Sequence, residues 1–200
     1  MSVSSVTLQA DLPRKWPPLQ GEWTFADYER LPDNGRRYEI IRGELYMSST
    51  PEVRHQRIIV ELVTRIRMFL YQHPIGRIFV APTDVRLSNN TTNVQPDLFF
   101  VSQERLAIVE KNYINGSPDL VIEVISSRYE SFDRSVKFDA YAQSGIREYW
   151  IVDPRKDTIE VNVLRGTAYV PLAIFSGTDA VRSEVLAELV LVAGDVFPAA

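Results

Sequence analysis

The stretch "SPDLVIEVISSRYESFDRSVKFDAY", residues 117–141, decides most of the predicted fold. Its first half contains a short apolar run, Leu120–Ile125, whose β-branched residues predict a buried strand. Glu123 lies in the middle of this run, although burying an unpaired carboxylate carries a high free-energy cost. The second half predicts a helix, which places Lys137 fourteen residues after Glu123. The pattern therefore indicates a carboxylate in the core and a lysine that can return to it from the next element.

Helices and strands are predicted on both sides of this unit. A helix over 132–145, ended by Gly145, separates strands predicted over 119–126 and 148–154, and such a crossover joins parallel strands. Apolar residues recur at helical spacing between 51 and 74, which predicts the longest helix. The other predicted elements are a short helix over 24–31, a hairpin over 37–48, strands over 77–87 and 95–102, and a second hairpin over 158–175. We therefore expect an α/β fold with a mixed β-sheet core flanked by helices and an N-terminal hairpin.

Length and composition limit the class of protein. The 200 residues suffice for one α/β domain with a sizeable core, which we expect over 21–200, after a flexible, proline-bearing N-terminal arm over 1–20. The chain has no cysteine, which excludes disulfides, a thiolate nucleophile and cysteine-bound zinc. No apolar run approaches the ~20 residues of a membrane span, and the N-terminus lacks the basic-then-apolar order of a signal peptide. We expect a cytoplasmic protein with no membrane partner.

The charge is unevenly distributed along the chain. The formal net charge of -4 argues against a protein that coats nucleic acid by bulk electrostatics. Between Arg36 and Arg77, however, eight arginines face four glutamates, so this part carries +4 and the remainder -8. One interpretation is a set of solvated helix faces with ion pairs. The other is a basic rim beside an acidic site.

Asp97 and Glu123 are acids of particular interest, because each lies in a short apolar strand sequence, "PDLFFV" and "LVIEVI". On neighbouring strands they would repel each other, and a divalent cation such as Mg²⁺, which prefers carboxylate oxygens, would remove the repulsion. The alternative is that each acid lies at a strand end or pairs with an arginine. Asp119 belongs to a second "PD" dipeptide, but it is four residues from Glu123, about 13 Å along a strand, and so cannot share a cation with it.

A family resemblance rests on an ordered set of motifs. The segments "RYEIIRGELYM", "QPDLFFVS", "PDLVIEVISS" and "DRSVKFDAYAQSGIREYWIVDP" together resemble the PD-(D/E)XK nuclease superfamily. More closely, they are similar to a large bacterial family described as "putative restriction endonucleases", or as a domain of unknown function. The resemblance covers residues 24 to 200 and implies a restriction-endonuclease-like fold.

The resemblance also implies roles for individual residues. Asp97 matches the metal-binding aspartate, and Glu123 matches the acidic member of the (D/E)-x-K element. The lysine of that element is replaced by Ile125, and in the closer family it has moved to the following helix, where Lys137 lies. Two auxiliary positions also match: Glu44, as a further ligand, and His55, for which capping or packing at a helix start is the alternative.

The expected activity is hydrolysis of phosphodiester bonds with Mg²⁺ or Mn²⁺ as cofactor and nucleic acid, DNA before RNA, as partner. Asp97, Glu123 and Lys137 would carry the reaction, with Tyr141 on the same helix face as Lys137. The expected phosphate contacts are Arg54, Arg57 and Arg134. A homodimer is possible on chemical grounds, because cleavage of two antiparallel strands needs two sites related by a twofold axis.

Two other classes of function stay open at this point. The chain could be an inactive nuclease-fold module that binds nucleic acid or a protein, which the missing consensus lysine and the acidic net charge favour. It could also use its carboxylates as a glycosidase does, with an acid and a base about 5–9.5 Å apart. The second alternative explains neither Lys137 nor the local excess of arginine.

Overall fold

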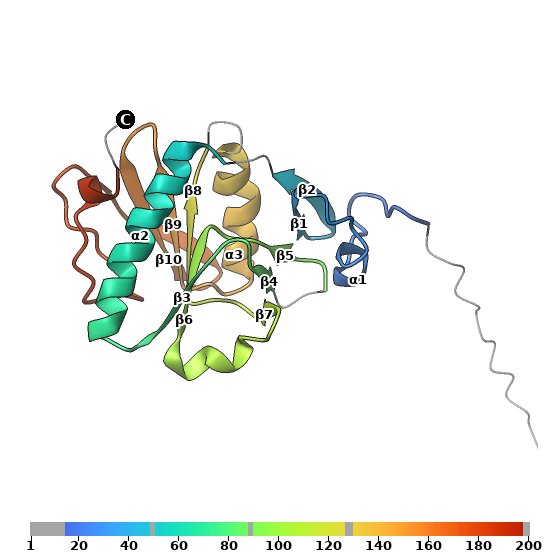
Figure 1. Cartoon of the computed structure of the whole chain (residues 1–200), viewed down its shortest axis with the longest axis horizontal. Helices are drawn as coiled ribbons and strands as arrows, with labels where there is room; N and C mark the ends of the chain where they lie inside the picture. Colours follow the sequence, from blue (N-terminus) through green and yellow to red (C-terminus); the bar gives the residue numbers. More distant parts are fainter. Residues whose placement is uncertain (1–14, 49–50, 88–89, 127–129, 198–200) are drawn as a thin grey trace, which may run out of the picture.

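The larger of two sheets forms the centre of the molecule. The computed structural model describes residues 15–48, 51–87, 90–126 and 130–197 (Figure 1). The strand order of this sheet is β11-β10-β9-β8-β6-β3. The bounds are β3 (Gly76–Val80), β6 (Leu98–Ser102), β8 (Leu120–Val124), β9 (Glu148–Asp153), β10 (Thr158–Arg165) and β11 (Ala168–Ser176). Only β8 and β9 pair in parallel, and the other pairs are antiparallel. The predicted mixed sheet and its helical crossover are therefore confirmed.

A smaller sheet lies beside it, with the order β2-β1-β5-β4-β7. Its strands are β1 (Arg37–Ile41), β2 (Glu44–Ser48), β4 (Asp84–Arg86), β5 (Asn93–Val94) and β7 (Tyr113–Asn115). The predicted N-terminal hairpin is β1–β2, which turns at Arg42 and Gly43, both with positive φ. The prediction of one strand over 77–87 is wrong, because the segment divides into β3 and β4 of different sheets. Pro82 lies at the break and has no N–H to donate to a strand ladder.

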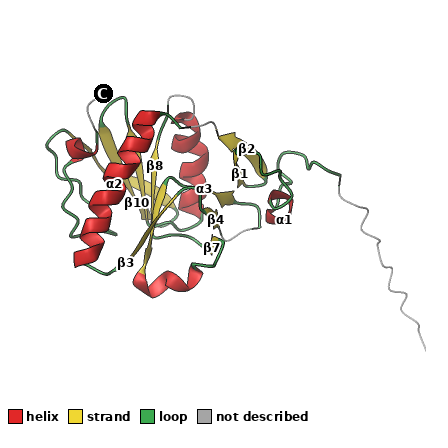
Figure 2. Cartoon of the chain, in the orientation of Figure 1, coloured by secondary structure: helices red, strands yellow, loops and turns green. Residues whose placement is uncertain are grey.

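The helices are α1 (Phe25–Tyr28), α2 (Val53–Gln72) and α3 (Phe138–Gln143), with short 3₁₀ turns at Gln103–Ile108 and Ala193–Val196. α2 and α3 cover opposite faces of the larger sheet, whereas α1 contacts β1 of the smaller sheet (Figure 2). Thr24 and Asp27 form a capping box, which fixes the start of α1. The predicted helix over 132–145 is present, but its first part, Phe132–Lys137, is a π-helix that continues into α3.

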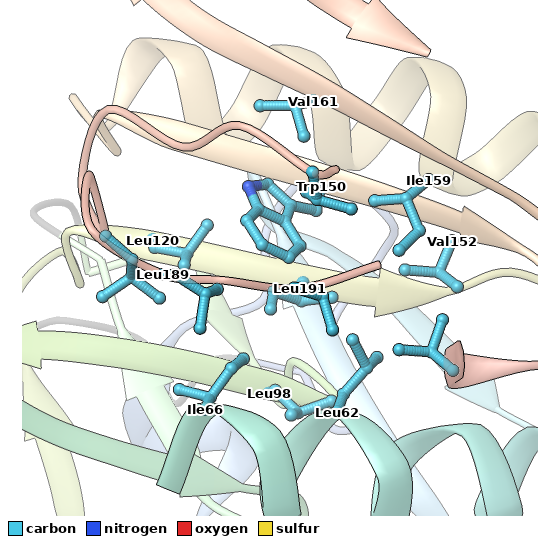
Figure 3. Packing of buried hydrophobic residues seen from close by; sticks show 14 of the residues in the cluster. Leu62, Ile66, Leu98, Leu120, Trp150, Val152, Ile159, Val161, Leu189 and Leu191 are labelled. Atoms are coloured by element: carbon cyan, nitrogen blue, oxygen red, sulfur yellow. The ribbon is translucent and has the colours of Figure 1, made fainter. Parts of the chain in front are cut away.

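Two hydrophobic clusters pack on the opposite faces of the larger sheet. On one face Leu62 and Ile66 of α2 pack against Leu98, Leu120 and Trp150, and the C-terminal segment closes over them (Figure 3). On the other face α3 packs against the strand residues that point away from α2, such as Phe99, Val121 and Tyr149. It also packs against the smaller sheet. Full burial of one such leucine or isoleucine contributes about 1.5–3 kcal/mol, so both helices are firmly held against the sheet.

The strand register decides where the two predicted acids lie. β6 and β8 pair antiparallel with Leu98 opposite Ile122, so Asp97, one residue before β6, comes beside Glu123. Asp97 has the same side-chain direction as Phe99, and Glu123 the same direction as Val121, which places both acids on the α3 face. The predicted arm over 1–20 falls mainly on residues 1–14, which lie outside the described residues. Within the described ranges, no helix is both long enough and apolar enough to cross a membrane.

Candidate active site

Asp97 is held by contacts from three separate elements. Its Oδ2 accepts a hydrogen bond from the backbone N–H of Val124 at 3.0 Å. The same oxygen lies 3.0 Å from Nε2 of His55, on the first turn of α2, and Oδ1 lies 3.7 Å from Nη1 of Arg37. Burial favours the neutral acid, but the hydrogen bond of His55 and the nearby Lys137 and Arg37 lower the pKa of Asp97. The geometry therefore keeps Asp97 ionised in a nearly solvent-free position.

Glu123 links the strand to the helix that follows it. Its Oε1 accepts hydrogen bonds from Nζ of Lys137 at 2.8 Å and from the hydroxyl of Tyr141 at 2.7 Å. Its Oε2 lies 3.3 Å from the backbone N of Asp97, which ties the two acids together. Burial raises the pKa of Tyr141, as does the neighbouring Glu123, so the phenol stays protonated and donates. The structure thus brings Asp97, Glu123, Lys137 and Tyr141 into one cluster.

Lys137 reaches a third carboxylate, which the sequence interpretation missed. Its Nζ lies 3.2 Å from Oε1 of Glu39 in β1, and 3.8 Å from Oδ1 of Asp133. Glu39 is buried and accepts a hydrogen bond from the backbone N–H of Gln95 at 2.8 Å. A signal for Glu39 was present, because it too is an acid inside an apolar strand sequence, "YEII". The resemblance directed attention to Glu44 of the same hairpin instead.

The buried charges of the cluster are not balanced among themselves. Asp97, Glu123, Glu39 and Asp133 surround the single buried lysine. Burial, together with the nearby acids Glu123 and Glu39, raises the pKa of Asp133 to about 8, although Lys137 opposes the rise. Burial likewise raises the pKa of Glu123, with Asp97 adding to the effect. The carboxylates raise the pKa of Lys137 despite its burial, so it stays cationic. A further cation at the site would favour the ionised forms of Asp133 and Glu123.

Asp97 and Glu123 are the residues that could hold a divalent metal ion. Mg²⁺ is commonly bound through one or two protein carboxylates and otherwise keeps waters and substrate oxygens. The adjacent side chains of Asp97 and Glu123 fit this requirement. Across the described ranges, no three Asp, Glu or His side chains are grouped so that they could enclose a metal ion by themselves. A metal ion held by Asp97 and Glu123 would therefore need further ligands from water or substrate.

The other predicted residues lie apart from this cluster. Glu44 is exposed and accepts a hydrogen bond from the hydroxyl of Tyr46 at 2.6 Å. Arg54 pairs with Asp157 at 2.8 Å, and Arg134 pairs with Glu160 at 2.6 Å. Arg57 is exposed on α2. His55, in contrast, lies at the cluster through its contact with Asp97 rather than serving as a helix cap.

Asp119, in the second "PD" dipeptide, has a separate environment. Its Oδ1 accepts a hydrogen bond from Arg105 at 2.8 Å, and its Oδ2 accepts one from the backbone N–H of Ser102 at 2.8 Å. These contacts join the end of β6 to the start of β8. The contacts of Asp119 thus differ from those of Asp97 and Glu123.

The sheet topology and the acid–lysine cluster define a restriction-endonuclease-like fold. The Uma2 family, described as "Putative restriction endonuclease", matches residues 25–194, and the chain belongs to this family. A crystal structure of "a putative nuclease belonging to DUF820" from Anabaena variabilis ATCC 29413 is similar in fold, with a TM-score of 0.73. The two share 22% sequence identity over 88% of this chain and 97% of that one. A search among curated proteins found no match.

Proposed function

We propose that the protein is a metal-dependent nuclease that hydrolyses phosphodiester bonds, with DNA as the first substrate to test. The observation that carries the proposal is the 2.8 Å contact between Nζ of Lys137 and Oε1 of Glu123, next to Asp97. A buried lysine between paired acids is unexpected in a protein that needs only a stable core, because buried charges contribute little to stability. Membership in a family described as restriction endonucleases supports the same reaction class.

The residues of the chain would divide the work as follows. Asp97 and Glu123 would hold Mg²⁺ or Mn²⁺, which when bound polarises a phosphate and lowers the pKa of the attacking water. Lys137, kept cationic by Glu123 and Glu39, would stabilise the negative charge that develops on the phosphate oxygens. Tyr141 fixes the orientation of Glu123, and His55 fixes that of Asp97. The ammonium and the two acids would thus be positioned before substrate binds.

A second candidate is an inactive nuclease-fold module that binds nucleic acid or a protein. It is favoured by the ion pairs of Arg54 and Arg134, since arginines held by carboxylates are less available for phosphates. It does not account for the buried position of Lys137 between Glu39 and Glu123. The nuclease therefore ranks first.

The test is a cleavage assay on supercoiled plasmid DNA and on single-stranded RNA, with Mg²⁺, Mn²⁺ or EDTA. We expect cleavage with Mg²⁺ or Mn²⁺, none with EDTA, and none with Asp97→Ala. Asp139→Ala, an exposed acid on α3, is the matched control and should cleave as the wild type does. Folded wild-type protein that cleaves neither substrate with either metal would contradict the proposal. Cleavage by Asp97→Ala would contradict the assigned site.

The proposal extends to organisation and location. Residues 21–200 would act as a single domain, because one hydrophobic cluster includes residues of both sheets and of α3. A homodimer would serve the cleavage of duplex DNA, in which the two strands run in opposite directions. A cytoplasmic location suits a chain without cysteine.

A further inference from the structure

We propose that Arg37 binds a backbone phosphate of the nucleic acid at the site, beside Asp97. The inference rests on the proposed function and adds a substrate-binding residue to it. Arg37 is the first residue of β1, two positions before Glu39, so both side chains leave the strand on the same side. Its Nη1 lies 3.7 Å from Oδ1 of Asp97. β1, which contributes Glu39 to the cluster, thus also places the guanidinium of Arg37 at the edge of the cluster.

The guanidinium of Arg37 is held in position by one residue. Its Nε donates to Oε1 of Gln95 at 3.3 Å, and its Nη2 donates to the Gln95 carbonyl at 2.7 Å. The backbone N–H of Gln95 donates in turn to Glu39, and Gln95 lies two residues before Asp97. The arginine is therefore fixed relative to both acids. A fixed side chain loses less conformational entropy when a ligand binds to it.

Arg37 has hydrogen-bonding capacity left beside Asp97. A guanidinium has five N–H donors, and the contacts to Gln95 use two nitrogens. The distance from Nη1 to Asp97 is that of an ion pair and is longer than a hydrogen bond. Within the described ranges, Nη1 makes no hydrogen bond. Planar guanidinium groups match phosphate oxygens well, so a phosphate is the ligand this group fits.

Exposure distinguishes Arg37 from the other basic groups near Asp97. Its side chain is 27% exposed, against 6% for Lys137 and 11% for His55. Lys137 is enclosed by carboxylates, whereas Arg37 is open to an incoming anion. Arg54 and Arg134 are more exposed, but carboxylates hold them at hydrogen-bonding distance. Arg37 alone among these combines closeness to Asp97, a fixed position and access from solvent.

The competing explanation is that Arg37 only offsets the charge of Asp97 and connects β1 to Gln95. In that case its loss would change stability but not the contact with nucleic acid. The decisive measurement is therefore the salt dependence of DNA binding, which counts phosphates that the protein neutralises. Binding is measured by fluorescence anisotropy with a short DNA duplex in EDTA, so that no cleavage occurs.

We expect Arg37→Gln to weaken binding by about tenfold and to reduce the slope of log affinity against log salt by about one. With Mg²⁺ it should reduce kcat/KM for cleavage by about 10²-fold. Arg37→Lys keeps the charge without the planar fork and should fall between the two proteins. The matched control is Arg36→Gln, an exposed neighbour in contact with Sδ of Met47, and it should behave as the wild type does.

A second measurement uses unaltered protein, in case the variants do not fold. Phenylglyoxal modifies arginines, and peptide mass spectrometry locates the modified residues. We expect DNA to protect Arg37 but not Arg36. Equal modification of Arg37 with and without DNA would overturn the inference, as would an Arg37→Gln protein with the wild-type salt slope.

The outcomes separate this inference from the proposed function. Wild-type cleavage with an indifferent Arg37→Gln variant overturns the role of Arg37 and leaves the nuclease intact. Binding that depends on Arg37 without cleavage in any metal supports the inference and contradicts the nuclease. A wild-type protein that neither binds nor cleaves DNA overturns both.

Discussion

Nζ of Lys137 lies 2.8 Å from Oε1 of Glu123, and both side chains are buried. The lysine comes from the π-helical turn after β8, whereas Ile125, directly after the strand, occupies the position two residues beyond Glu123. Ile125 is packed in the core on the same side of the sheet as Glu123. The ammonium group that contacts Glu123 thus comes from a helix, although a lysine at position 125 would lie on the same side of the sheet.

Lys137→Ala should abolish nuclease activity. It should also lower the free energy of unfolding by about 3 kcal/mol, because it leaves buried carboxylates without their cation. The double variant Lys137→Ala with Ile125→Lys should regain measurable cleavage, since the new side chain points into the same cluster. Cleavage rates and urea unfolding check both statements, with Lys156→Ala as the exposed control. A fully active Lys137→Ala protein would refute the assigned role.

Metal binding should stabilise the protein. A ligand that binds only the folded state at a hundredfold excess over its Kd adds about 2.7 kcal/mol to the free energy of unfolding. We therefore expect millimolar Mn²⁺ to raise Tm by several degrees, and the double variant Asp97→Asn with Glu123→Gln to lose the increase. The measurement is a thermal melt with and without Mn²⁺, and Asp139→Asn serves as control. An unchanged Tm of the wild type would count against a metal site.

Two acids of the N-terminal hairpin should differ in importance. Glu39 lies 3.2 Å from Nζ of Lys137 and is buried, whereas Glu44 is exposed and bonded to Tyr46. Glu39→Gln should reduce cleavage by about 10²-fold, because it removes one of the charges that keep Lys137 in position. Glu44→Gln should cleave at close to the wild-type rate. The reverse result would restore Glu44 as the auxiliary residue of the hairpin.

Asp119 should make stability depend on pH in the acid range. Although burial opposes ionisation, the Ser102 N–H and Arg105 lower the pKa of Asp119 below its usual 3.8 in the folded protein. A folded pKa below the unfolded one gives stability that is present above about pH 4 and is lost as pH falls through the folded value.

The test for Asp119 compares two proteins at two pH values. Asp119→Asn should lower the free energy of unfolding by about 1–3 kcal/mol at pH 7, because the negative charge and one of the two acceptor oxygens are lost. The difference from the wild type should shrink at pH 3, and urea unfolding at both pH values measures it. A difference that stays constant with pH would assign the effect to packing.

Much of this fold was predictable because its signals are local. The apolar stripe of α2, the turn at Arg42–Gly43 and the strand–helix–strand order around Glu123 all lie within short windows of sequence. The division into two sheets was not predictable, because β3 and β4 have similar sequence character and differ only in distant partners. The π-helix over Phe132–Lys137 was also missed, since propensity does not distinguish its hydrogen-bonding pattern from that of an α-helix.

The candidate site shows the same division. Asp97, Glu123 and Lys137 stand out because each is unusual in its own segment. Arg37 gains its meaning only from the pairing of β1 with β5, which brings it next to Gln95 and hence to Asp97. Glu39 had a local signal in "YEII", but its contact with Lys137 is visible only in the folded structure. Contacts of this kind depend on the assembled tertiary structure and leave little trace in a single sequence.

The cluster draws on residues from Glu39 in β1 to Lys137 in the last turn of the π-helix. A ribosome must therefore release most of the chain before the ammonium can meet the acids. Products of interrupted translation that stop before residue 137 would contain Asp97 and Glu123 without their lysine. The proposed activity would thus require a chain that has been synthesised past residue 137 and folded.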